Sequence, residues 1–131
     1  MIIKNIKDLS PDWNETQFTN AIRDAVCFLD GYSLKLGASM FMAKGTPDTD
    51  YFLAGVSFLL ESKVHPFKVS PIQAEQLSRI RGGTGSAWAA TLRNQKIIFD
   101  SGNEFIDIYS MLKFCVGEAK RKALAHELRQ L

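Results

Sequence analysis

The amino-acid sequence predicts a single-domain α/β fold in which a mixed central sheet is flanked by helices. The length of 131 residues suits one domain with a sizeable core, spanning residues 1–131. Stretches with apolar residues at helical spacing alternate with short runs rich in aromatic and β-branched residues. Gly, Pro, Asn or Asp marks the junctions between them. These observations predict the order helix, strand, strand, strand, helix, strand, strand, helix (αβββαββα).

The composition is that of an ordinary globular protein, with 46% hydrophobic and 23% charged residues. No apolar run approaches the ~20 residues of a membrane span, and the start of the chain lacks the apolar region of a signal peptide. We therefore expect a cytoplasmic protein without membrane contact. Cys27 and Cys115 lack metal-ligand spacing and lie in apolar helical patterns, which predicts buried, reduced thiols. The net charge of +2 permits a local basic face but does not by itself indicate nucleic-acid binding.

The first helix is predicted to begin after its cap, Asn14, and to end before Asp30 and Gly31. Glu15 stands at its N-terminal end. An acid there complements the helix dipole, or it reaches the metal site described below as a further carboxylate. A strand is expected over residues 32–42, and Lys44 follows it close to the same site.

Two apolar runs, residues 51–53 and 56–60, are predicted to form a hairpin around Ala54 and Gly55. Gly adopts a positive φ without steric cost, which suits a tight turn. If these two residues alone form the loop, the residues that flank it face each other. Counting outward along the two strands then places Asp48 opposite Glu61.

Acidic and basic side chains are expected to gather at the open end of this hairpin. Directly opposed residues of an antiparallel pair share a face, with Cβ atoms roughly 5 Å apart. Because side chains alternate along a strand, Lys63 joins Glu61 on that face, and Asp50 lies one diagonal step away. The pattern leaves open whether Asp48 or Asp50 is the ligand that pairs with Glu61.

Opposed carboxylates destabilise a hairpin unless something neutralises them. Magnesium does so well, because it takes oxygen ligands and usually only one or two protein carboxylates. Such an ion lowers the pKa of a bound water and stabilises charge on a phosphate oxygen. Lys63 would help to activate the water or stabilise the pentavalent phosphate. The hairpin therefore predicts a metal site for phosphodiester cleavage; the alternative is a surface hairpin whose polar residues are merely solvated.

The second half of the chain is predicted to start with a helix over residues 71–81, capped by Ser70. Gln73 lies near its start, either as a solvated amide or close to the end of the strand that carries Lys63. Residues 82–86 resemble a phosphate-binding loop only superficially, because no Gly-Lys-Ser/Thr completes it. They are predicted to form a helix C-cap and a flexible connection. Strands follow over residues 87–92 and 96–99, and a last helix over about residues 103–131. Its basic run Lys120, Arg121 and Lys122 is a solvated face or, alternatively, a phosphate-contacting patch.

Taken in order, these features resemble the PD-(D/E)xK nucleases, most closely the small VRR-NUC type of phages and bacteria. The resemblance covers roughly residues 13–110. It rests on Glu15 in the first helix, the turn 45–48, the strand that ends in Glu61, Ser62 and Lys63, the helix start 70–73 and the small-residue strand 87–90. The valine-arginine-arginine signature that names the closest type is absent, and Ser86, Ala87 and Trp88 stand in that region.

The resemblance implies a restriction-endonuclease-like fold and magnesium- or manganese-dependent hydrolysis of DNA, in the cytoplasm of a bacterium or a phage-infected host. Structure-selective cutting of branched, flap or junction DNA is implied in the same way. The resemblance makes Asp48 and Glu61 the metal ligands, completed by the backbone carbonyl of Ser62 and by Glu15 directly or through water. Lys63 would then assist the attacking water, and Gln73 would support Lys63.

Two other functions stay open at this stage. The first is a catalytically inactive nuclease-fold module for DNA binding or assembly; the intact set of Asp48, Glu61 and Lys63 speaks against it. The second is a small interaction protein, such as an inhibitor or immunity factor, which would bind no divalent metal. The tail beyond Tyr109 fits a homodimer interface and a DNA-contacting helix equally well.

Overall fold

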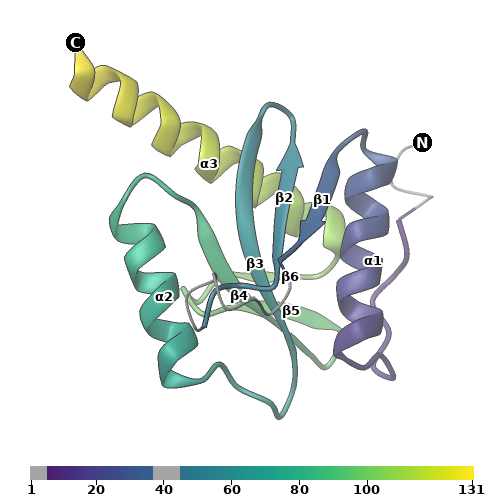
Figure 1. Ribbon diagram of the computed structural model, residues 1–131. Helices are drawn as coiled ribbons and strands as arrows, with labels where there is room; N and C mark the ends of the chain where they lie inside the picture. Colours follow the sequence, from purple (N-terminus) through teal and green to yellow (C-terminus); the bar gives the residue numbers. More distant parts are fainter. Residues whose placement is uncertain (1–5, 37–44) are drawn as a thin grey trace.

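The computed structural model describes residues 6–36 and 45–131. Within these ranges the chain forms three helices and one six-stranded mixed sheet in the strand order β1-β2-β3-β4-β5-β6 (Figure 1). The elements are α1 (Glu15–Phe28), β1 (Tyr32–Lys35), β2 (Thr49–Leu53), β3 (Val56–Val64), α2 (Pro71–Gly82), β4 (Ala87–Arg93), β5 (Lys96–Phe99), β6 (Glu104–Phe105) and α3 (Ile108–Gln130). The predicted α/β class is confirmed. The structure does not describe residues 37–44, so residues 37–42 of the predicted first strand, and Lys44 after it, lie outside the described residues.

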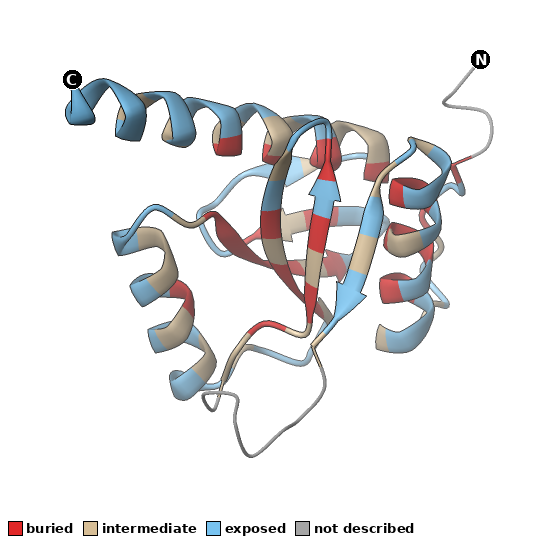
Figure 2. Cartoon of the chain, turned by 45° about the horizontal axis from the view of Figure 1, so that its top comes forward, coloured by how far each residue is buried: buried red, intermediate tan, exposed pale blue. Residues whose placement is uncertain are grey.

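The sheet is covered by helices on both faces. On one face α1 and α3 contribute to the main core, which includes Phe18, Ile22, Phe58, Leu60 and Met111. On the other face α2 packs through a smaller cluster built on Leu77, Ala87 and Ala89. Figure 2 shows the buried positions concentrated in the strands and on the helix sides that face them. None of the helices in the described ranges has the length and hydropathy of a membrane span.

Strand pairing is antiparallel throughout the sheet except between β3 and β4, which run parallel and are connected through α2. This arrangement places Lys63 of β3 beside Thr91 of β4. In a parallel pair the residues in register project to the same face. Lys63 and Thr91 therefore project to one face, which is also the face of Leu59, Ala87 and Ala89 that α2 covers.

The prediction that the last helix starts near residue 103 is wrong. Gly102 has φ +97° and its amide donates to the carbonyl of Phe99, so the chain turns tightly and returns as the short strand β6. The helix α3 begins at Ile108, after Asp107, whose carboxylate accepts from the amide of Ser110 at 2.7 Å. Small polar residues favour both turns and helix caps. Here residues 100–103 form the turn, and Asp107 caps the helix.

Two further expectations are corrected on the helices. Cys27 is exposed, whereas Cys115 is buried as predicted, because Cys27 lies on the outer side of α1. The loop after α2 is fastened to α3: the ammonium of Lys122 donates to the carbonyls of Arg81 at 2.9 Å and Gly85 at 2.6 Å. Carbonyls at a helix C-terminus lack intrahelical partners, and a lysine satisfies them well. Lys122 therefore has a structural contact and is not part of a merely solvated face.

Candidate metal centre

Three carboxylates from three separate elements meet at one end of the sheet. Glu15 is the first residue of α1, Asp48 directly precedes β2, and Glu61 lies within β3. One oxygen of each carboxylate lies within 4.8 Å of the others. Oxygen atoms at this mutual separation can contact one divalent cation, since such cations hold their ligands at about 2.0–2.6 Å.

The turn of the β2–β3 hairpin sets the relation between Asp48 and Glu61. Ala54 and Gly55 have φ values of 53° and 84°, as a two-residue hairpin loop with two left-handed positions requires. The strands are then paired as predicted, from Leu53 opposite Val56 to Thr49 opposite Leu60. One further step along the same register takes Asp48 to the level of Glu61.

Helix capping positions Glu15. Asn14 caps α1, its side chain accepting from the amide of Gln17 at 2.8 Å, while the Gln17 side chain accepts from the amide of Asn14 at 2.9 Å. This capping box fixes the first turn of the helix. Glu15 is thereby held in that turn, where the helix dipole favours a negative charge.

The three acids are close enough to perturb one another. Burial and the charge of Asp48 raise the pKa of Glu61 to about 7, while Lys63 opposes the shift. Burial and the charge of Glu15 likewise raise the pKa of Asp48. Glu61 is only 5% exposed, and its Oε2 lies 3.8 Å from Nζ of Lys63. One oxygen of Asp48, Oδ1, is buried and has no hydrogen-bond partner within residues 6–36 and 45–131. Within the described residues, the three carboxylates therefore carry more negative charge than the Lys63 ammonium balances.

This arrangement predicts a stability change with pH in metal-free protein. The Glu61 pKa is about 7 in the folded state against an ordinary 4.5, so the folded state binds this proton more tightly. Between these values the unfolded chain loses the proton first, which favours unfolding as pH rises. We expect the contribution of Glu61 to fall by about 3 kcal/mol across this window and to level off above pH 7.

The check is urea denaturation with a chelator at pH 5, 6, 7 and 8, comparing the natural protein with Glu61→Gln. The glutamine stays neutral, so the variant should gain stability relative to the natural protein as pH rises, with most of the gain below pH 7. Stability profiles that stay parallel over the whole range would mean that Glu61 titrates normally.

Asp50 lies apart from this group. It pairs with Leu59 in the β2–β3 ladder, and its pKa is raised by its own burial. The third carboxylate beside Asp48 and Glu61 is Glu15, on a different element. Of the two ligands that the hairpin pattern left open, the geometry thus favours Asp48.

Ser62 and Gln73 are placed less decisively. Ser62 lies between Glu61 and Lys63 on β3, fully buried, and its hydroxyl has no hydrogen-bond partner in the described part of the chain. The Gln73 side chain accepts from the amide of Ser70 at 2.9 Å and so completes the capping box of α2. No hydrogen bond joins Gln73 to Lys63 among the described residues. Metal ligation by the Ser62 carbonyl and support of Lys63 by Gln73 stay predictions.

Two neighbours of the cluster were not predicted from the sequence. Lys35 of β1 lies opposite Thr49, and its charge lowers the pKa of Asp48. Tyr51 is completely buried, and its hydroxyl has no hydrogen-bond partner in the part of the chain that the structure describes. Burial together with the charge of Asp48 raises its pKa. The alternation of side chains along residues 49–53 could have predicted that Tyr51 is buried. Lys35 could not be found in this way, because the offset between β1 and β2 depends on the path of the chain between them.

Gly45 connects the turn before Asp48 to helix α2. Its φ is +81°, and a Cβ atom there would lie 2.7 Å from the carbonyl oxygen and 2.6 Å from Cγ2 of Ile72. Gly55 has a similar φ of +84°, but a Cβ atom would meet nothing within 4 Å. Gly55→Ala should therefore cost only the left-handed backbone penalty, about 1 kcal/mol, whereas Gly45→Ala should cost at least 1 kcal/mol more.

Urea denaturation of both variants checks this prediction. Gly45→Ala should also weaken any stabilisation by magnesium or manganese, because the clash displaces the segment that carries Asp48. Equal losses of stability in the two variants would show that the turn can move away from Ile72 at no cost.

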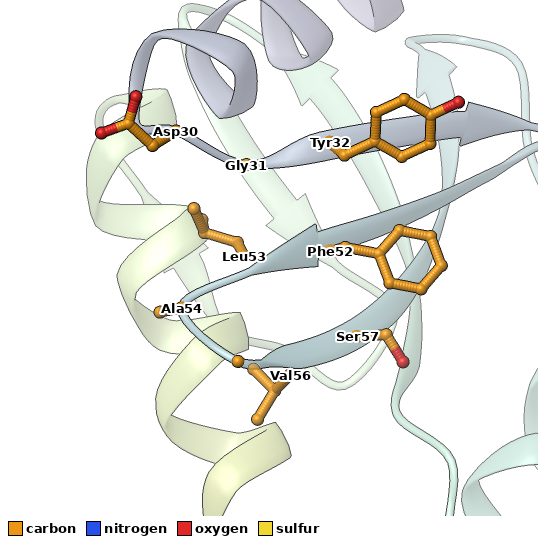
Figure 3. Close-up of a pocket in the computed structure, with 9 residues that line it drawn as sticks. Asp30, Gly31, Tyr32, Phe52, Leu53, Ala54, Val56 and Ser57 are labelled. Carbon is orange, nitrogen blue, oxygen red and sulfur yellow. The ribbon is translucent and has the colours of Figure 1, made fainter.

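A hollow of about 440 Å³ lies at the opposite end of the hairpin (Figure 3). The exposed rings of Tyr32 and Phe52 stand beside it on neighbouring strands, with centroids 6.2 Å apart. Phe52 is four residues from Asp48, which corresponds to roughly 13 Å of extended chain. This hollow is therefore separate from the carboxylate cluster.

Comparison with protein-family models, with curated proteins and with solved structures found no match for this chain.

Proposed function

We propose that this protein is a divalent-metal-dependent endonuclease that hydrolyses phosphodiester bonds in DNA. The observation that carries the proposal is the meeting of Glu15, Asp48 and Glu61 within 4.8 Å, with the Lys63 ammonium 3.8 Å from Glu61. The same four residues are those to which the resemblance to PD-(D/E)xK nucleases assigns the metal and the attacking water. The first seven elements also follow the predicted order.

The residues of the cluster fit magnesium or manganese. All three side chains offer carboxylate oxygens, which these hard cations prefer. Within the described residues, Lys63 lies beside Glu61 and the charge of Lys35 acts on Asp48, so the three carboxylates outnumber the nearby ammonium groups. A divalent cation would offset the excess negative charge. Oδ1 of Asp48 is also buried and has no hydrogen-bond partner among residues 6–36 and 45–131, whereas a buried oxygen ordinarily has one. Glu15, Asp48 and Glu61 are therefore the side chains that would hold the ion.

The remaining chemistry is assigned to Lys63. When bound, the ion would acidify a water and offset charge on the phosphate. During hydrolysis a water oxygen bonds to phosphorus as one ester P–O bond breaks, and negative charge grows on the phosphoryl oxygens. The Lys63 ammonium lies beside Glu61 on the same strand, where it can donate a hydrogen bond to these oxygens or orient the water. Its side chain is only 15% exposed, so this charge is weakly screened by solvent.

Cleavage of labelled DNA tests the proposal. Linear, nicked, flapped and four-way substrates are incubated with magnesium, with manganese or with a chelator, and the products are resolved on denaturing gels. Cutting that needs the metal and is lost in Glu61→Gln is the expected result. Preference for branched or flapped DNA would support the structure-selective role that the resemblance implies.

A second readout, metal-dependent thermal stabilisation, separates the alternatives. Absence of cutting together with absence of stabilisation by either metal would contradict the nuclease and favour a protein-interaction role. Stabilisation by metal with DNA binding but no cutting would favour the inactive DNA-binding module. A single species of twice the monomer mass in light scattering would identify the homodimer.

A further inference from the structure

A second surface feature lies next to the carboxylate cluster, on the same face of the sheet. It is a groove of about 390 Å³ between the β3–α2 connection and the strands β4 and β5. Its wall includes Thr91, which lies beside Lys63 in the parallel β3–β4 register. Neighbouring strands are about 4.8 Å apart, so the groove begins one strand away from Lys63.

The groove carries uncompensated positive charge. Lys68 and Arg93 line it, both are exposed, and neither forms an ion pair within the described ranges of the chain. Asp100 also lines it, but its carboxylate is already engaged. One oxygen lies 2.7 Å from Nη1 of Arg81, and the other accepts from the amide of Ala89 at 3.0 Å. The balance of free charge in the groove is therefore cationic and complements a phosphate backbone.

An aromatic side chain is presented at the same place. Phe67 is 69% exposed and lines the groove directly beside Lys68. Its ring stacks on no other aromatic ring in the described part of the chain. Exposed rings beside cationic side chains are the usual platform on which single-stranded nucleic acids stack their bases.

We infer that this groove binds an unpaired strand of nucleic acid, with phosphates on Lys68 and Arg93 and a base stacked on Phe67. A single strand suits the groove better than a duplex, because the faces of paired bases are covered by their neighbours in the stack. The strand would lead past Thr91 to Lys63. The inference rests on the proposed nuclease function and deepens it: the substrate has a single-stranded segment next to the bond that is cut.

Fluorescence anisotropy with a short labelled oligothymidylate and with a mixed-sequence duplex of equal length tests the groove. A chelator is present, so binding is measured without cleavage. Phe67→Ala should weaken binding of the single strand about 5- to 150-fold, the range for loss of one base–aromatic stack. Phe67→Trp should restore it, and duplex binding should be unchanged by either substitution. Tyr32→Ala is the matched control, because Tyr32 is 63% exposed on the same face but at the far end of the hairpin.

The salt dependence supplies an independent readout. Removing one phosphate contact from a single-strand complex should reduce the slope of log affinity against log salt by about 0.7. Lys68→Gln and Arg93→Gln should each show this reduction, whereas Lys113→Gln on the exposed side of α3 should not. An unchanged slope in both groove variants would overturn the assignment of the phosphates.

Different experimental results would contradict the groove proposal and the nuclease proposal. Single-strand binding that depends on Phe67, with no metal-dependent cutting, would overturn the nuclease and leave the groove. Metal-dependent cutting with equal single-strand affinity in Phe67→Ala, Tyr32→Ala and the natural protein would overturn the groove alone. Absence of any single-strand binding by the natural protein would also overturn the groove.

Discussion

Glu61→Gln should lower the rate of metal-dependent DNA cleavage by at least a thousandfold, which corresponds to about 4 kcal/mol of activation free energy. A carboxylate oxygen of Glu61 lies within 4.8 Å of those of Asp48 and Glu15, and its Oε2 lies 3.8 Å from Nζ of Lys63. The glutamine keeps the shape of the side chain but removes the negative charge that would hold the ion. Single-turnover cleavage with enzyme in excess measures the loss without interference from product release.

The loss of activity in this variant should not reflect unfolding. The glutamine removes the cost of burying a carboxylate beside two others, so the metal-free variant should be at least as stable as the natural protein at pH 8. Stabilisation by magnesium or manganese should be reduced. A Glu61→Gln protein that cleaves at the natural rate would show that the reaction occurs elsewhere on the molecule.

Asp48→Asn and Asp50→Asn form a matched pair with the second large effect. The two acids are two residues apart at the start of one strand, but only Asp48 lies with Glu15 and Glu61. Asp48→Asn should lower cleavage by at least a hundredfold, about 3 kcal/mol of activation free energy, whereas Asp50→Asn should change it by less than about threefold. Cleavage rates and metal titrations of the two variants give the comparison directly. The reverse order of effects would make Asp50 the ligand and require a shifted hairpin in the active protein.

Local sequence signals predicted the parts of the fold that depend on local chemistry. A two-residue turn at Ala54 and Gly55 fixes the β2–β3 register, because pairing is set by loop length. Capping residues likewise gave the starts of α1 and α2. By contrast, the sequence does not show that the polar residues 100–103 form a turn before β6 and that Asp107 caps α3. That arrangement is decided by packing, including the contact of Phe105 with Phe99 at 4.9 Å between ring centroids.

In the candidate site, too, the residues that share a local sequence pattern could be predicted, and those that depend on distant contacts could not. Asp48, Glu61 and Lys63 follow from one turn and the alternation of side chains along two strands. Glu15 is more than thirty residues from Asp48, and no local pattern connects them, so its place depended on the resemblance. The pKa of Glu61 and the free charge of the neighbouring groove depend on burial and on which ions are already paired. Neither is encoded in spacing.

The distribution of the three acids over the chain links metal affinity to folding. Glu15 belongs to α1, whereas Asp48 directly precedes β2 and Glu61 lies in β3, so an ion held by all three would join the helix to a hairpin that is far from it in sequence. Detachment of α1 from the sheet would release the ion. The free energy of detachment would therefore rise by the free energy of ion binding at the prevailing metal concentration. Helix α2 contributes none of the three acids and would keep its own rate of local opening. The ion would thus stabilise the contact between α1 and the β2–β3 hairpin, and a chain that has not yet docked α1 would lack one of the three carboxylates of the cluster.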